Sequence, residues 1–216
     1  MKSLTENKLG GLLLMLGIII IVVTIVFEFK IGWVGPERSP DEVPGFIYEN
    51  WSGLKIIWGW QMVGHVFMAL AFMHFALKAN IILRLLWLFL VLCEVLGVVA
   101  FGFVLGSYYP ALEIFDEQPA LFLTVRGGIR TLYLASYLSG LLFIIPFCVE
   151  TFRKKGRISK VIGIVTLSVM VGIGIFGNVM GYSGQISGLG FFLLPLVFGY
   201  SFWRNGNEIE QEGRLK

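Results

Sequence analysis

The chain has 216 residues, of which 56% are hydrophobic and only 14% are charged, and its mean hydropathy is +0.81. Because soluble globular proteins carry about 25% charged residues, this composition excludes an ordinary soluble domain and predicts an integral membrane protein. The formal net charge of +3 is too small to suggest a nucleic-acid partner, so the expected partner is the lipid bilayer.

A helix needs roughly 20 mostly apolar residues to cross about 30 Å of hydrocarbon. Six segments of the sequence meet this requirement, and no other stretch is long enough and polar enough to form a separate soluble domain. We therefore expect one membrane domain over residues 1–216, an all-α bundle of six transmembrane helices. The expected spans cover about residues 9–28, 55–77, 81–105, 130–149, 160–180 and 186–203.

The first span follows two lysines and resembles the core of a secretory signal peptide. Its apolar run, GGLLLMLGIIIIVVTIVF, is longer than a usual signal-peptide core. The following EFKIGWVG offers no small-residue cleavage site, so we expect the segment to be retained as a membrane span.

The second and third spans are joined by a turn near residues 78–81 and should form an antiparallel hairpin. Residues at equal distances from the turn lie at equal depth, and His65 and Glu94 meet this condition near the middle of the two spans. An ionisable side chain at the bilayer centre costs about 3 kcal/mol or more, so it needs a partner and is a functional candidate. A His65–Glu94 pair would supply the hydrogen bond or counter-charge that hydrocarbon lacks. Equal depth leaves open whether the two side chains face each other.

Gln61 lies one helical turn from His65 and shares its face, whereas His74 is nine residues from His65 and falls on the opposite face. The two histidines would be about 13 Å apart along the helix axis, so they cannot clamp one haem. Two histidines and one buried glutamate also fall short of the usual ligand set of a metal enzyme. The sequence therefore assigns no metal site, and the cofactor stays unknown.

A polar stripe leads into the fourth span. It places two guanidinium groups and two phenols on one helix face at i, i+4, i+7 and i+11: Arg126, Arg130, Tyr133 and Tyr137. This arginine–tyrosine stripe could receive an anion or a carboxylate-bearing ligand through bidentate hydrogen bonds. The alternative is that its arginines pair with acidic residues of the preceding loop: Glu113, Asp116 and Glu117. That loop, about residues 106–129, and the one at about 29–54 are expected over the external mouth of the bundle.

The last two spans share a run of glycines: Gly172, Gly174, Gly177, Gly181, Gly184, Gly188 and Gly190. Lipid provides no hydrophobic force between helices, so we expect close backbone approach at glycines to join these spans in a tight hairpin. Two prolines lie inside spans, Pro146 in the fourth and Pro195 in the sixth. Each removes one backbone donor and should kink its helix.

Orientation follows from the positive-inside rule, which places the side richer in lysine and arginine in the cytoplasm. With six spans, most of these residues fall on the side that holds both termini: Lys2, Lys8, Lys78, Arg84, Arg153, Lys154, Lys155, Arg157, Lys160, Arg204, Arg214 and Lys216. The opposite side holds Lys30, Arg38, Lys55, Arg126 and Arg130. We therefore expect a multi-pass protein of the cell (inner or plasma) membrane with both termini cytoplasmic.

The leading functional hypothesis is a transporter-like, channel-like or small-ligand-binding membrane protein with His65, Glu94 and Gln61 at its polar centre. A small molecule or ion would approach from outside along the arginine–tyrosine stripe. If protons are coupled, His65 is the side chain that changes protonation near neutral pH. The alternative is a structural or accessory subunit of a larger membrane complex or oligomer, in which the same residues only join neighbouring helices.

A third hypothesis is an intramembrane enzyme. Gly181-Tyr182-Ser183-Gly184 resembles the GxSG motif around the nucleophile of rhomboid intramembrane proteases, which also have six spans and cytoplasmic termini. The resemblance implies Ser183 as nucleophile, but no histidine follows it to act as the base. We therefore assign no catalytic residue and place the two non-enzymatic hypotheses first.

Overall fold

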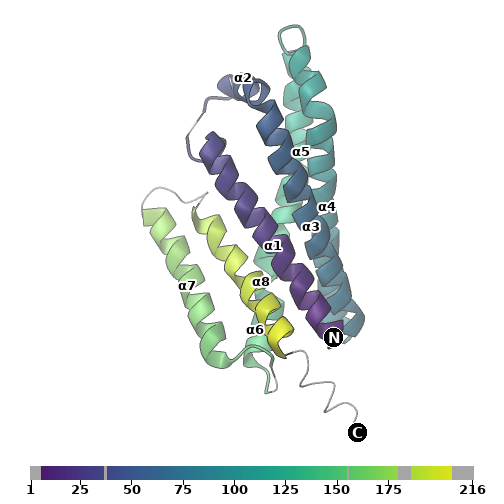
Figure 1. Cartoon of the computed structure of the whole chain (residues 1–216), viewed down its shortest axis with the longest axis vertical. Coiled ribbons are helices and arrows are strands. Elements are labelled where there is room, and N and C mark those ends of the chain that lie inside the picture. Colours follow the sequence, from purple (N-terminus) through teal and green to yellow (C-terminus); the bar gives the residue numbers. More distant parts are fainter. Residues whose placement is uncertain (1–5, 37, 155, 180–185, 206–216) are drawn as a thin grey trace, which may run out of the picture.

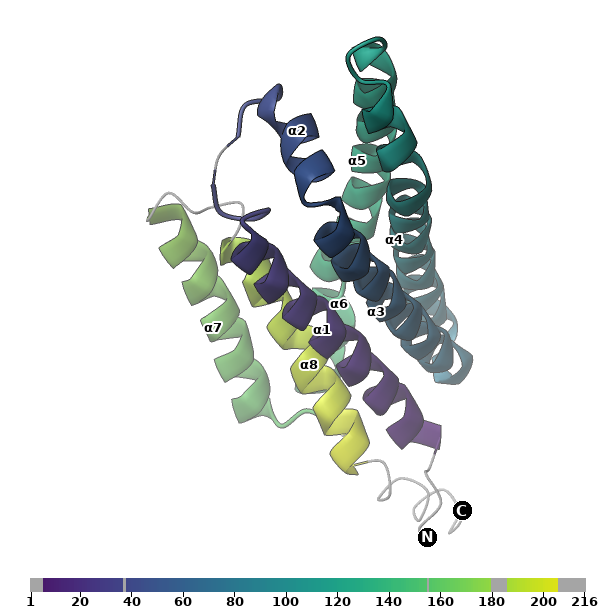
Figure 2. The ribbon, with the colours of Figure 1, turned by 45° about the horizontal axis from the view of Figure 1, so that its top comes forward.

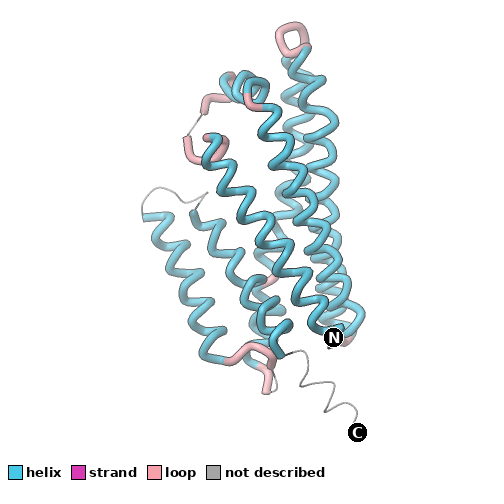
Figure 3. The backbone as a smooth tube through the Cα atoms, viewed as in Figure 1, coloured by secondary structure: helices cyan, strands magenta, loops and turns pink. Residues whose placement is uncertain are grey.

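The computed structural model describes residues 6–36, 38–154, 156–179 and 186–205. These residues form α-helices joined by short loops, with no strand among them (Figure 1, Figure 3). The helices are α1 (Glu6–Ile31), α2 (Glu42–Glu49), α3 (Trp51–Lys78), α4 (Ile81–Glu113), α5 (Pro119–Leu142), α6 (Ile144–Phe152), α7 (Lys160–Val179) and α8 (Ile186–Asn205).

Within the described residues, four helical segments are long and apolar enough to cross a membrane: Lys8–Ile31, Trp51–Lys78, Ile81–Glu113 and, with α5 and α6 taken together, Pro119–Phe152. A shorter apolar stretch in α7 covers Lys160–Phe176. Large apolar side chains also point outward, and Ile82 is 77% exposed and Val161 73% exposed. Such a surface suits lipid better than water, so the fold supports a helical membrane protein.

α1 packs between α3 and α8, while α4 packs between α3 and α5 (Figure 1, Figure 2). α7 lies against α8 at the edge of the bundle. The start of α1 and the end of α8 lie at the same end of the bundle as the α3–α4 turn and the α6–α7 loop (Figure 1). We call this the basic end because it carries most of the described lysines and arginines: Lys8, Lys78, Arg84, Arg153, Lys154, Arg157, Lys160 and Arg204.

The expected loop at residues 106–129 is wrong, because α4 continues to Glu113 and α5 begins at Pro119. Proline suits the first helical position because its missing N–H would have no helical partner there, and the apolar residues that follow extend the helix inward. α4 has 33 residues. At 1.5 Å per residue it is about 50 Å long, longer than the hydrocarbon core. Its outer end and the start of α5 therefore form a hairpin that rises above the other helices (Figure 1).

The expected kink at Pro146 is confirmed as a helix break. α5 ends at Leu142, the residue whose carbonyl the proline leaves without a helical donor, and α6 begins at Ile144. Phe143 lies between them, and its backbone N–H still donates to Ser139 at 2.9 Å. Pro195, in contrast, lies inside α8 without interrupting the helix.

Among the described residues, the closest approach between two glycine backbones lies between α1 and α8 rather than between the last two helices. A Cβ atom on Gly11 would be 2.5 Å from the carbonyl oxygen of Gly199, so the two backbones touch here. α7 and α8 do pack together, with Gly190 close to Met170, but Cβ atoms on Gly172 or Gly174 would meet no atom within 4 Å. Gly181 and Gly184, which belong to the glycine run of the predicted hairpin, lie outside the described residues.

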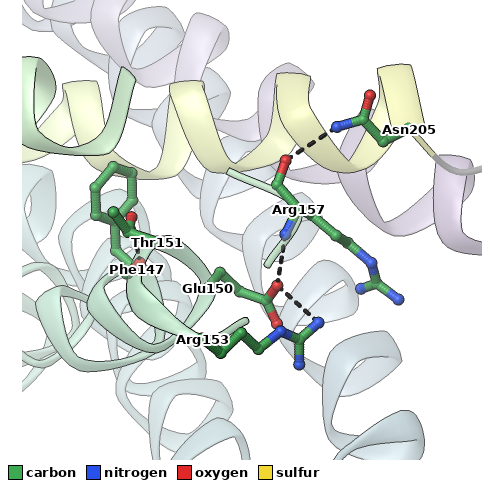
Figure 4. A network of polar contacts seen from close by, with 6 residues as sticks. All are labelled: Phe147, Glu150, Thr151, Arg153, Arg157 and Asn205. Carbon is green, nitrogen blue, oxygen red and sulfur yellow. Dashed lines mark hydrogen bonds and ion pairs between the residues drawn. The ribbon is translucent and has the colours of Figure 1, made fainter. Parts of the chain in front are cut away.

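A polar network at the basic end joins α6, the following loop and α8 (Figure 4). The buried Glu150 carboxylate pairs with Arg153 at 2.9 Å and accepts the backbone N–H of Arg157 at 3.2 Å. Asn205 donates to the Arg157 carbonyl at 2.9 Å. The Arg157 guanidinium lies over the Phe202 ring, 4.1 Å from its centroid, and its burial lowers the pKa of this group. These contacts anchor the end of α8 to the rest of the bundle.

Two apolar clusters fill most of the interior. One extends toward the basic end and contains the aromatic side chains Phe72, Phe75, Trp87, Phe143, Phe147, Phe198 and Phe202. The other lies toward the opposite end, where Val43 and Ile47 on the buried face of α2 pack on α3 and α4. Its further members include Leu54, Trp58, Phe101, Tyr108 and Phe122. Between the two clusters lies the polar centre of the molecule.

Candidate functional site

Three neighbouring helices contribute to the polar centre. His65 Nδ1 of α3 lies 2.6 Å from Glu94 Oε2 of α4, and the Ser139 hydroxyl of α5 donates to Glu94 Oε1. Glu94 is 0% exposed, so its carboxylate depends on these two partners. The structure thus places in contact the two residues that the sequence only placed at equal depth, and it adds Ser139.

Gly97, one turn along α4 from Glu94, makes this contact sterically possible. A Cβ atom at this position would lie 2.7 Å from the Ser136 hydroxyl oxygen and 3.1 Å from His65 Nδ1. The missing side chain lets the imidazole and the serine of α5 approach the backbone of α4. The His65 ring then rests beside Phe101, with ring centroids 5.5 Å apart.

Gly97→Ala is expected to destabilise the protein by about 1–3 kcal/mol, since the new methyl group must displace His65 or Ser136. The measurement is thermal and denaturant unfolding of the purified protein in detergent. Gly102→Ala is the matched control, because a Cβ on Gly102 of the same helix would meet no atom within 4 Å. Equal stability of the two variants would contradict the packing described here.

A second carboxyl group, Glu28 of α1, lies on the same interior side of the bundle. The Trp58 indole N–H donates to Glu28 Oε1 at 2.8 Å, and Gln61 is a second hydrogen-bonding neighbour. Glu28 and Gln61 are each 6% exposed. Trp58 and His65 are seven residues apart on α3, so the Glu28 and Glu94 levels are separated by about 10 Å along the helix axis.

Glu28 is not among the site residues predicted from the sequence, in which it lies where the first expected span gives way to a loop. α1 instead continues to Ile31. A signal was present in the spacing: Glu28 follows Ile21 by seven residues, two turns along the face that also carries the buried Leu14 and Ile18. A carboxylate that continues a buried apolar face is a candidate for an interior site.

A cavity of about 490 Å³ lies between α1, α3, α4, α5 and α8. This volume falls in the range of sites for small organic ligands. The polar residues of its wall are Glu28, Gln61, His65, Glu94, and Ser136 and Ser139 of α5. The aromatic residues of the wall are Trp33, Trp58, Phe101, Tyr108, Tyr133, Tyr137, Phe191 and Phe192.

The structure divides the arginine–tyrosine stripe. Tyr133 and Tyr137 line the cavity, but Arg126 and Arg130 do not. The two arginines lie closer to the start of α5, where the apolar cluster that contains Phe101, Tyr108 and Phe122 packs between α4 and α5. In the part of the chain that the structure describes, neither arginine forms a salt bridge with the acidic residues named above: Glu113, Asp116 and Glu117.

His74, the second histidine of α3, does not line the cavity. His74 packs against α1, where a Cβ on Gly10 would be 2.6 Å from its ring carbon Cδ2. Ser183, the nucleophile implied by the rhomboid resemblance, lies outside the described residues. Among residues 6–36, 38–154, 156–179 and 186–205, no group of three or more His, Cys, Asp and Glu side chains is placed to hold a metal ion.

Comparison with known proteins adds no relative. No family model, curated protein or solved structure matches this chain. The function must therefore be inferred from the cavity and the groups that line it.

Proposed function

We propose that this chain is a small transporter-like membrane protein that binds a small molecule or ion in the cavity between α1, α3, α4, α5 and α8. The observation that carries the proposal is the position of the His65–Glu94 pair, which borders a cavity of about 490 Å³ rather than a filled core. A pair that only joined two helices would need no open volume beside it. Intramembrane ionisable groups that line a cavity mark ligand or ion pathways in many membrane proteins.

Within this proposal, His65 is the group that meets the ligand or a proton. Its Nδ1 is held by Glu94, and its Nε2 has no hydrogen-bond partner among the described residues. A ring nitrogen that is left free on a cavity wall can donate or accept a hydrogen bond, so it suits ligand binding or proton exchange. Gln61 and Glu28 extend the polar wall from Glu94 by about 10 Å along the helix axis, away from the basic end.

We further propose six membrane spans, with α7 and α8 as the fifth and sixth, and both termini in the cytoplasm. The gathering of lysines and arginines at the basic end supports this orientation by the positive-inside rule. The outer face of α7 is apolar, with Val161, Ile164 and Val165 all more than half exposed, which suits lipid contact.

A structural role in a larger membrane complex is the second candidate. It is favoured by one observation: both Glu94 oxygens already have protein partners, His65 and Ser139. These contacts among His65, Glu94 and Ser139 satisfy the carboxylate without a ligand. The ligand-binding and structural candidates therefore differ in whether the cavity beside Glu94 admits small molecules.

The test is chemical access to the cavity wall. Ser136 lines the cavity, so a Ser136→Cys variant in a Cys93→Ala/Cys148→Ala background is expected to react with methyl methanethiosulfonate in the folded state. Ala71→Cys is the control, because Ala71 is 0% exposed and does not line the cavity. Mass spectrometry of the intact protein measures the rate of modification. If Ser136→Cys reacts no faster than Ala71→Cys, the ligand-binding proposal fails and the structural candidate is favoured.

A further inference from the structure

We infer that the ligand of this cavity is a monovalent organic cation, an ammonium or similar group carried on an apolar body, held between Glu28 and Glu94. The inference rests on the proposed ligand-binding function and names the chemical class that the cavity selects. The sequence suggested an anion or a carboxylate-bearing ligand instead, because it grouped Arg126 and Arg130 with the tyrosines of α5.

The charges on the wall favour a cation. Among the described residues, the lining includes the carboxyl groups of Glu28 and Glu94 and the imidazole of His65, but no lysine or arginine. Glu94 already has two partners, His65 and Ser139, whereas the partners of Glu28 are the neutral side chains of Trp58 and Gln61. A buried carboxylate without a counter-charge is costly, and a bound cation would supply that charge. A bound anion would instead meet like charge without a lysine or arginine to compensate it.

The aromatic rings of the wall favour an organic cation over a metal ion. Around Glu28, the Trp58 ring makes edge contacts with Trp33 and Tyr108, with centroids 5.6 Å and 6.1 Å apart. Ring faces attract ammonium groups within about 6 Å and tolerate apolar substituents on the cation. A metal ion would need several oxygen or nitrogen ligands converging on one point, whereas the two carboxyl groups lie about 10 Å apart along the helix axis.

The side of the cavity between α5 and α8 suits entry of an apolar molecule from the bilayer. Tyr137 and Phe191 meet edge to face there, with ring centroids 6.2 Å apart. The Tyr137 side chain is 51% exposed although it lines the cavity. Tyr137 therefore lies between the cavity and the surface of the bundle on this side.

The experiment compares two ions of nearly identical shape and opposite charge, tetraphenylphosphonium and tetraphenylborate, on the full chain purified in detergent. Each is measured alone, because the two ions pair with each other, by equilibrium dialysis and by its effect on thermal unfolding. We expect saturable binding of tetraphenylphosphonium and at least tenfold weaker binding of tetraphenylborate. Glu28→Gln and Glu94→Gln should each weaken tetraphenylphosphonium binding about tenfold or more, since each removes one negative charge. Glu49→Gln, at an exposed carboxylate on α2, should change the affinity less than twofold.

Glu28→Asp keeps the charge and is expected to retain most of the affinity, which separates loss of charge from loss of fold. Equal binding of the two ions, or full affinity in Glu28→Gln, would overturn the inference. Absence of tetraphenylphosphonium binding would overturn it as well. The Ser136→Cys experiment then shows whether the cavity is accessible to small molecules. If Ser136→Cys is modified, the cavity is accessible and only the choice of a cation is wrong. If it is not modified, the proposed function fails together with the inference.

Discussion

His65→Ala is expected to lower the free energy of unfolding by about 3 kcal/mol, the largest loss among single substitutions at the polar centre. Glu94 is fully buried, and His65 is its only ion-pair partner among the described residues. Without the imidazole, the carboxylate must either stay charged in an apolar interior or take up a proton, and both cost folding energy. The measurement is denaturant unfolding of the purified protein in detergent.

The double variant His65→Leu/Glu94→Leu is expected to recover most of this loss. Replacing both members of a buried ion pair by apolar side chains removes the uncompensated charge together with its partner. Glu94→Gln keeps a side chain of similar size beside Ser139. Its free energy of unfolding should lie between those of His65→Ala and the double variant. If the double variant is as unstable as the sum of its single variants, the two residues are not energetically coupled and the pair does not stabilise the bundle.

Gly11→Leu is expected to destabilise the contact between α1 and α8 by about 3 kcal/mol or more. A Cβ atom on Gly11 would lie 2.5 Å from the Gly199 carbonyl oxygen and 2.7 Å from the Trp203 backbone nitrogen. Both atoms belong to the backbone and cannot turn aside as a flexible side chain would, so the two helices must separate. Because α8 forms one wall of the cavity, ligand binding should weaken in the same variant.

Thermal unfolding and limited proteolysis of the α7–α8 region measure this effect. Gly11→Ala should also lower the stability, but by less than Gly11→Leu, since its single methyl group already meets the Gly199 backbone. Gly172→Leu is the matched control, because a Cβ at that exposed position of α7 would meet no atom within 4 Å. Wild-type stability in Gly11→Leu would show that α1 and α8 do not cross at these glycines.

His65→Ala and Gly11→Leu test different contacts of the same bundle. Gly11 and Gly199 bring α8 close to α1, and the His65–Glu94–Ser139 contacts join α3, α4 and α5. The cavity lies between these two groups of helices and depends on both. A loss of binding without a loss of stability therefore points to the residues on the wall, such as Glu28, and not to the helix contacts.

The sequence by itself determined the membrane class, the position of most helices along the chain and the depth of His65 and Glu94. These properties are local, because hydropathy depends on composition and depth follows from a constant rise per residue on either side of a short turn. The break at Pro146 was equally local, since a proline in a helix removes a donor at a known position.

Only the tertiary structure decided which helix faces meet and where space remains between them. Glu28 and Ser139 join the site from α1 and α5, and Arg126 and Arg130 lie outside it, although their stripe suggested otherwise. The contact between Gly11 and Gly199 joins helices at opposite ends of the chain. Such contacts depend on the rotation and crossing of helices that lie far apart in the sequence. The spacing of residues within one helix can indicate its buried face, but it does not say which neighbouring helix that face meets.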